Sequence, residues 1–126
     1  MAEAFRKVAS IADKEITQVA DNETVNANSY KDYDLEVPLG RTGIAITLKV
    51  TYDSSATQGA KIELYYSQDG LNWDTDTDTT YDMPFSAGET KQKTFVTQAV
   101  TPYIRIRVKN LDSSKAMTIS LWVTSI

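Results

Sequence analysis

The sequence predicts an all-β protein, an antiparallel β-sandwich of jelly-roll-like type with seven or eight strands. Three observations predict it: apolar and polar residues alternate in several runs, turn-forming residues separate these runs, and no long helical pattern lies between them. Short strands joined by turns indicate an antiparallel sandwich or barrel and argue against a parallel sheet. We expect one sandwich domain over residues 31–126, preceded by an N-terminal arm or first strand over residues 1–30.

The first thirty residues carry a weaker pattern than the rest of the chain. Their apolar residues recur at three- and four-residue spacings that would also suit a helix face: Phe5, Val8, Ala12, Ile16 and Val19. The β-formers Thr17, Thr24 and Val25, together with several asparagines after residue 20, favour an extended conformation. We therefore expect an extended arm or first strand, and such an arm would offer Phe5, Val8 and Ile11 to a partner.

Two strands are expected next, over residues 33–39 and residues 44–52. In the first, Tyr33, Leu35 and Val37 alternate with polar residues, and Pro38 places this strand at an edge or ends it. The second shows the clearest alternation of the chain, with its apolar row beginning at Ile44 and ending at Tyr52. A turn over residues 39–43 separates the two strands.

Further strands are expected over residues 61–66, 93–100, 103–109 and 117–124. All but residues 93–100 alternate clearly, and such alternation is typical of strands with one dry and one solvated face. The segments between them are rich in Asp, Asn, Ser and Gly, as at Asp69-Gly70, which is a hairpin signal.

Composition excludes several classes of function. The chain has 126 residues, no cysteine, no histidine and a net charge of −4. Disulfides, zinc bound by sulfur or imidazole, and nucleophilic sites built on Cys or Ser-His are therefore absent. The acidic balance argues against nucleic acid as a partner, no apolar stretch reaches the roughly 18 residues of a membrane-spanning helix, and no signal peptide is visible. We expect a non-enzymatic protein without nucleic-acid or membrane partners.

Alternating carboxylates at Asp74, Asp76 and Asp78 form the most conspicuous local motif. Calcium prefers several oxygen ligands, but the pattern departs from a helix-loop-helix calcium loop, with Thr79 where glycine is required and Phe85 where glutamate is required. Paired carboxylates also serve glycoside hydrolases, yet nothing here predicts the apolar pocket that raises the pKa of one of them. We expect no cofactor, with calcium at the three aspartates as the alternative.

Charge is distributed unevenly along the chain. Residues 68–90 contain six acids and no base, whereas residues 91–111 contain five bases, Arg105 and Arg107 among them, and no acid. Such complementary segments either pair across strands within the fold or make contacts between subunits. Both interpretations stay open.

Several aromatic residues fall outside the aliphatic rows. Tyr65, Tyr103 and Trp122 lie opposite these rows, and Trp73 and Tyr81 flank the acidic stretch. Exposed rings stack on sugars or anchor protein interfaces, although a second covered face would instead bury them. A carbohydrate-binding module that uses Trp73, Tyr81 and the aspartates is one hypothesis.

Residues 65–75 read Tyr-Tyr-Ser-Gln-Asp-Gly-Leu-Asn-Trp-Asp-Thr, and residues 103–110 read Tyr-Ile-Arg-Ile-Arg-Val-Lys-Asn. These segments resemble small β-sandwich structural proteins of tailed-bacteriophage virions. The resemblance implies a capsid decoration or stabilising (cement) protein in the virion, made in the host cytoplasm, with a major capsid or other virion protein as partner and a homo-oligomer, such as a trimer, as its state. The alternative is a carbohydrate-binding or receptor-binding β-sandwich module, tail-associated if it belongs to a virion.

Overall fold

The computed structural model describes residues 8–10, 17–38 and 40–126, and these residues form strands and loops without any helix. The strands are β1 (Val8–Ser10), β2 (Thr17–Val25), β3 (Tyr30–Glu36), β4 (Gly43–Tyr52), β5 (Ala60–Ser67), β6 (Thr79–Asp82), β7 (Thr90–Gln98), β8 (Tyr103–Asn110) and β9 (Met117–Ser125). The all-β prediction is confirmed. Within the described ranges there is accordingly no helix that could span a membrane.

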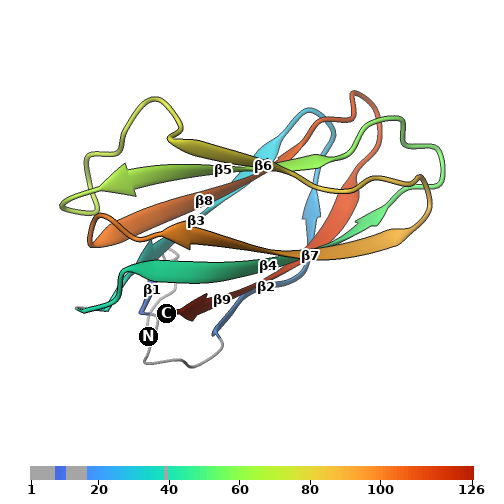
Figure 1. Cartoon of the computed structure of the whole chain (residues 1–126). Helices are drawn as coiled ribbons and strands as arrows, with labels where there is room; N and C mark the ends of the chain where they lie inside the picture. Colours follow the sequence, from blue (N-terminus) through green and yellow to red (C-terminus); the bar gives the residue numbers. More distant parts are fainter. Residues whose placement is uncertain (1–7, 11–16, 39) are drawn as a thin grey trace.

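The strands form two sheets that pack face to face as a sandwich (Figure 1). The five-stranded sheet has the order β1-β3-β8-β5-β6 and the four-stranded sheet has the order β2-β9-β4-β7. From β2 to β9 each connection crosses to the other sheet, with the exception of the β5–β6 pair. This crossing pattern confirms the jelly-roll-like sandwich. All strand pairs are antiparallel apart from β1, which runs parallel to β3.

The predicted strands agree with the structure wherever the alternation is strong. β3 ends at Glu36, two residues before Pro38, as the proline requires. β2 lies within the range expected to hold an arm or first strand, and it pairs with β9 along most of its length. Its register shifts near Asn22, which has a positive φ of 51° that asparagine tolerates better than most residues. The short strand β6 was not expected.

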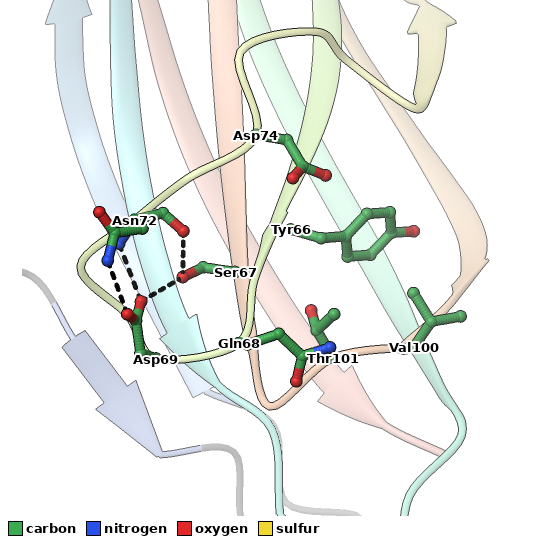
Figure 2. Close-up of a pocket in the computed structure, with 8 residues that line it drawn as sticks. All are labelled: Tyr66, Ser67, Gln68, Asp69, Asn72, Asp74, Val100 and Thr101. Carbon is green, nitrogen blue, oxygen red and sulfur yellow. Dashed lines mark hydrogen bonds between the residues drawn. The ribbon is translucent and has the colours of Figure 1, made fainter.

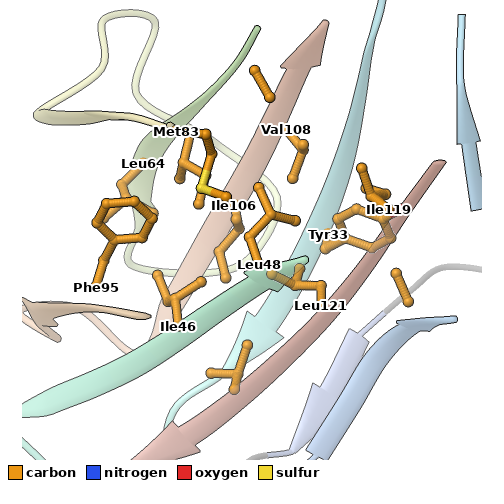
Figure 3. Packing of buried hydrophobic residues seen from close by; sticks show 14 of the residues in the cluster. Tyr33, Ile46, Leu48, Leu64, Met83, Phe95, Ile106, Val108, Ile119 and Leu121 are labelled. Carbon is orange, nitrogen blue, oxygen red and sulfur yellow. The ribbon is translucent and has the colours of Figure 1, made fainter. Parts of the chain in front are cut away.

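The hydrophobic core lies between the two sheets (Figure 3). Alternate residues of β4 and β9 point into it from one side, and those of β8 and β5 point into it from the other. Its fully buried large side chains are Tyr33, Leu35, Ile44, Ile46, Leu48, Ile62, Leu64, Ile104, Ile106, Ile119 and Leu121. The residues that face the core in β4, β5, β8 and β9 are mainly apolar, and the residues between them, most of them polar, form the outer faces.

The outer faces of the two sheets differ in character. On the four-stranded sheet, the register aligns Thr24, Thr118, Thr51 and Thr90 in one row across all the strands. The hydroxyls of Thr51 and Thr90 hydrogen-bond at 2.9 Å. We call this surface the threonine face. The outer face of the five-stranded sheet is instead rich in charged and aromatic residues.

Candidate functional site

The loop between β5 and β6 is organised by the carboxylate of Asp69. It accepts hydrogen bonds from the backbone N–H groups of Leu71 at 2.9 Å and Asn72 at 2.8 Å, and from the side-chain amide of Asn72 at 2.7 Å. These donors hold the pKa of Asp69 well below its usual range. Gly70 supplies the positive φ of 76° that the Asp-Gly turn needs. The loop therefore has a fixed shape.

A pocket of about 420 Å³ opens between this loop and the turn that precedes β8. It is lined by Tyr66, Ser67, Gln68, Asp69, Asn72, Asp74, Val100 and Thr101. Figure 2 shows the side chains of Asp74, Gln68, Thr101 and Val100 around the ring of Tyr66, while Asp69 and Asn72 face each other at the opposite side of the loop. We call this cavity the end pocket.

The residues around the Tyr66 ring are held by contacts that leave polar groups facing the cavity. The Tyr66 hydroxyl donates to the carbonyl of Gln98 at 3.1 Å, and the backbone N–H of Asp74 donates to the carbonyl of Tyr66 at 3.1 Å. Among the described residues, none donates a hydrogen bond to the Asp74 carboxylate. Among the described lining residues, the end pocket thus offers a carboxylate, an amide and an apolar surface, made mostly by Val100, to a ligand.

A second cluster lies on the outer face of the five-stranded sheet. Arg105 donates to Asp34 through Nε at 2.8 Å and Nη2 at 3.1 Å, and Arg107 donates to Asp32 through the same atoms at 2.8 and 3.0 Å. These bidentate pairs raise the pKa of both guanidinium groups, chiefly through the hydrogen bonds to the aspartates. Each arginine is therefore fixed in position and charge.

Aromatic rings cover these arginines. The Trp73 ring centre lies 4.4 Å from the Arg105 guanidinium carbon, and Arg107 lies 3.9 Å from the ring centre of Tyr30 and 4.8 Å from that of Tyr65. Such stacking adds cation–π attraction to the ion pairs. We call this surface, made of Tyr30, Asp32, Asp34, Glu63, Tyr65, Trp73, Arg105 and Arg107, the arginine face.

The arginine face also contains a buried glutamate. Glu63 is 7% exposed and accepts a hydrogen bond from the Tyr65 hydroxyl at 2.9 Å. Its Oε2 atom forms ion pairs with Nζ of Lys61 at 3.7 Å and with Nζ of Lys109 at 3.6 Å. Burial and the bond to Glu63 together raise the pKa of Tyr65. The bases of β8 thus pair within the fold, and their partners come from β3 and β5 instead of from residues 68–90.

The structure brings some of the predicted interaction residues together and separates others. Trp73, Arg105 and Arg107 meet on the arginine face. Tyr81 lies at the sheet edge, where it stacks on Phe95 with ring centres 4.6 Å apart, and Trp122 lies on the threonine face opposite Thr47. Trp73 and Tyr81 therefore do not share a surface. Val8 begins β1, whereas Phe5 and Ile11 lie outside the described residues.

The three alternating aspartates lie in the loop before β6, not in a strand. Asp74 lines the end pocket, and Asp76 and Asp78 are exposed. Within the described part of the chain, no group of acidic residues is arranged to hold a metal ion. The absence of a cofactor stays a prediction.

Sequence reasoning missed the pocket residues Tyr66, Gln68, Val100 and Thr101. Tyr66 lies in a predicted strand, and both Tyr66 and Gln68 lie in the segment that carries the virion resemblance, but neither was predicted to line a binding site. Their proximity depends on two connections that are about thirty residues apart in the chain, so no local pattern could have identified it.

Replacing Gly70 by Ala should destabilise the fold by about 1–2 kcal/mol. An added Cβ would lie 3.2 Å from the Tyr103 ring, at a backbone φ of +76° that L-residues rarely adopt. The matched control is Gly40→Ala, because Gly40 has a similar φ of +83° but nothing within 4 Å of the added Cβ. Urea unfolding should show a larger loss for the Gly70 variant, and equal losses would contradict the close contact with Tyr103.

Comparison with known proteins yields structural similarity alone. No family model and no curated protein matches the chain. Tripeptidyl peptidase 2 is similar at a TM-score of 0.59 and 10% identity over 92% of this chain, which spans only 10% of that protein. The mitogen of Yersinia pseudotuberculosis is similar at a TM-score of 0.54 and 14% identity, and the match covers 88% of this chain and 86% of the mitogen.

A carbohydrate-binding module of Cellvibrio mixtus lichenase 5A, solved in complex with cellotriose, is also similar. Its TM-score is 0.51 at 10% identity, covering 87% of this chain and 90% of the module. At such identities the similarity establishes the β-sandwich fold, which this chain shares with binding modules and with parts of larger proteins.

Proposed function

We propose that this protein is a non-catalytic carbohydrate-binding module whose sugar site is the end pocket. The observation that carries the proposal is one open cavity of about 420 Å³ that combines the exposed side chain of Val100 and the small exposed part of Tyr66 with hydrogen-bonding groups. That volume lies within the range of ordinary small-molecule sites.

The chemistry of the lining suits a sugar ring. Val100, which is 62% exposed, provides most of the apolar surface for the C–H groups of the ring, and Tyr66, which is 7% exposed, adds a small part. Asp74 can accept hydrogen bonds from sugar hydroxyls, and the Gln68 amide can both donate and accept. The Thr101 hydroxyl already donates to the carbonyl of Tyr103 at 2.8 Å, so towards a sugar it can only accept. The similarity to a module that binds cellotriose supports the same class of ligand.

The arrangement of carboxylates supports binding without hydrolysis. A glycosidase needs two carboxyl groups that reach the scissile bond, one of them with a raised pKa. Of the two carboxylates in the end pocket, Asp69 is engaged by the N–H groups of its own loop and has a lowered pKa. Among the described residues that line the pocket, Asp74 is then left without a catalytic partner.

Binding can be tested on a glycan array, followed by calorimetry with cellotriose and related neutral oligosaccharides. Gln68→Ala should weaken binding about three- to tenfold, because it removes one hydrogen-bonding amide from the pocket. Gln92→Ala is the matched control, since Gln92 is also an exposed amide but lies on the threonine face. EDTA should leave binding unchanged.

Absence of binding to any glycan at millimolar concentration would refute the proposed function. Equal losses in the two glutamine variants would refute the end pocket as the site.

We propose a structural role in a tailed-phage virion, as a capsid decoration or tail-associated protein, as the second candidate. The two segments that carry the resemblance to such proteins meet on the arginine face, where Trp73 stacks on Arg105 and Tyr65 on Arg107. Mixing the purified protein with shells of its virion should give stable co-sedimentation and greater heat resistance of the shells. Shells that neither retain the protein nor gain heat resistance would refute this role.

A further inference from the structure

We infer that the end pocket selects sugars with a protonated amino group over neutral sugars, and neutral sugars over acidic ones. This inference rests on the proposed function and specifies its ligand class. It follows from the charges that line the pocket and from the way each of them is held.

Among residues 8–10, 17–38 and 40–126, those that line the end pocket include two carboxylates and no basic side chain. Asp69 contributes negative charge but few acceptor sites, because its oxygens already accept from Leu71 and Asn72. Its carboxylate therefore repels an acidic ligand without offering a sugar new hydrogen bonds. Uronic acids and sulfated sugars are disfavoured for this reason.

Asp74 is the carboxylate that a ligand can reach. Its backbone is fixed by the hydrogen bond to the carbonyl of Tyr66, and Figure 2 shows its side chain beside the Tyr66 ring within the cavity. A hydroxyl can donate to this carboxylate, but an ammonium group forms a stronger, charge-assisted hydrogen bond there.

Of the described basic residues, neither Arg105 nor Arg41 lines the end pocket. Arg105 is committed to Asp34 and lies beneath Trp73 on the arginine face. Arg41 lines a smaller cavity of about 210 Å³, which shares only Val100 and Thr101 with the end pocket. An ammonium group on the ligand would supply the missing positive charge.

The test compares chitotriose, tri-N-acetylchitotriose, cellotriose and a glucuronate oligomer by calorimetry at about pH 5, where the amino groups of glucosamine units are protonated although neighbouring oxygens make them less basic than ordinary amines. Chitotriose should bind about three- to tenfold more tightly than cellotriose. The glucuronate oligomer should bind most weakly. The preference for chitotriose should shrink at high salt, because partly exposed charges are screened.

Asp74→Asn should abolish the preference for chitotriose while leaving cellotriose affinity within about twofold, since the amide keeps the size and one acceptor oxygen. Asp76→Asn is the matched control, because Asp76 is exposed in the same loop and outside the pocket lining. Loss of the preference in both variants would overturn the inference by showing a diffuse charge effect. Equal affinities of the native protein for chitotriose and cellotriose would also overturn it while leaving the proposed function intact. Absence of binding to all four sugars would instead refute the proposed function.

Discussion

Replacing Asp112 by Ala is expected to lower the melting temperature on the order of 10 °C, because it removes one carboxylate that joins two loops. Oδ1 accepts from the backbone N–H groups of Thr57 at 2.7 Å and Gln58 at 3.1 Å. Oδ2 accepts from those of Ser114 at 3.0 Å and Lys115 at 2.8 Å. Asp112 is only 1% exposed, so water cannot readily replace the lost acceptors.

A matched control is available in Asp53→Ala. Asp53 also follows a strand and accepts from a backbone N–H, that of Ser55 at 2.8 Å, but it is exposed to water. Calorimetric melting should show a small change for the Asp53 variant and a large one for the Asp112 variant. Similar changes in both would mean that the link between the two loops contributes little.

The same residue predicts a pH dependence of stability. The backbone N–H groups of Thr57 and its neighbours lower the pKa of Asp112 in the folded state. A lowered folded pKa gives stability that is complete above the unfolded pKa of about 3.9 and is lost as the pH falls below it. The difference in melting temperature between the native protein and Asp112→Ala should therefore narrow below about pH 4.

Replacing Leu48 by Ala is expected to destabilise the protein by about 3 kcal/mol, as measured by urea unfolding. Leu48 is fully buried near the middle of β4 and lies opposite Leu121 of β9 in the core (Figure 3). Truncation removes buried apolar surface and leaves a cavity that strands paired on both sides cannot easily fill.

Thr47→Ala provides the comparison one residue away on the same strand. Thr47 points outward and hydrogen-bonds Thr94 at 2.8 Å on an exposed surface, so its loss should cost under about 1 kcal/mol. If Leu48→Ala cost no more than Thr47→Ala, the assignment of the two faces of β4 would be wrong.

Most of the strands could be predicted because alternation reports directly which face of a strand is buried. β4, β8 and β9 have long apolar rows, and each was located to within about two residues. β6 was missed because its residues, Thr79–Asp82, are mostly polar. Pairing with β5 and the packing of Tyr81 on Phe95 hold it in place, and neither contact has a local signature.

The candidate site was less predictable than the fold. The sequence identified Trp73, Arg105 and Arg107 as interaction residues but could not show that Trp73 lies on Arg105. The aspartates that pair with Arg105 and Arg107 lie on β3, which is far from β8 in the sequence. The two strands are neighbours in the sheet, and no local pattern indicates this pairing. The end pocket required two loops to close on each other, which depends on the tertiary fold.

The order of the strands also bears on how the molecule is made. β2 pairs with β9, and the hydrogen bond from the Asn22 backbone to Ser120 joins residues 98 positions apart. β3 likewise pairs with β8, which follows it much later in the sequence. Such non-local pairing is typical of domains that fold in milliseconds to seconds, more slowly than helical ones. During synthesis on the ribosome, β2 must therefore remain without its neighbour until β9 has emerged from the exit tunnel.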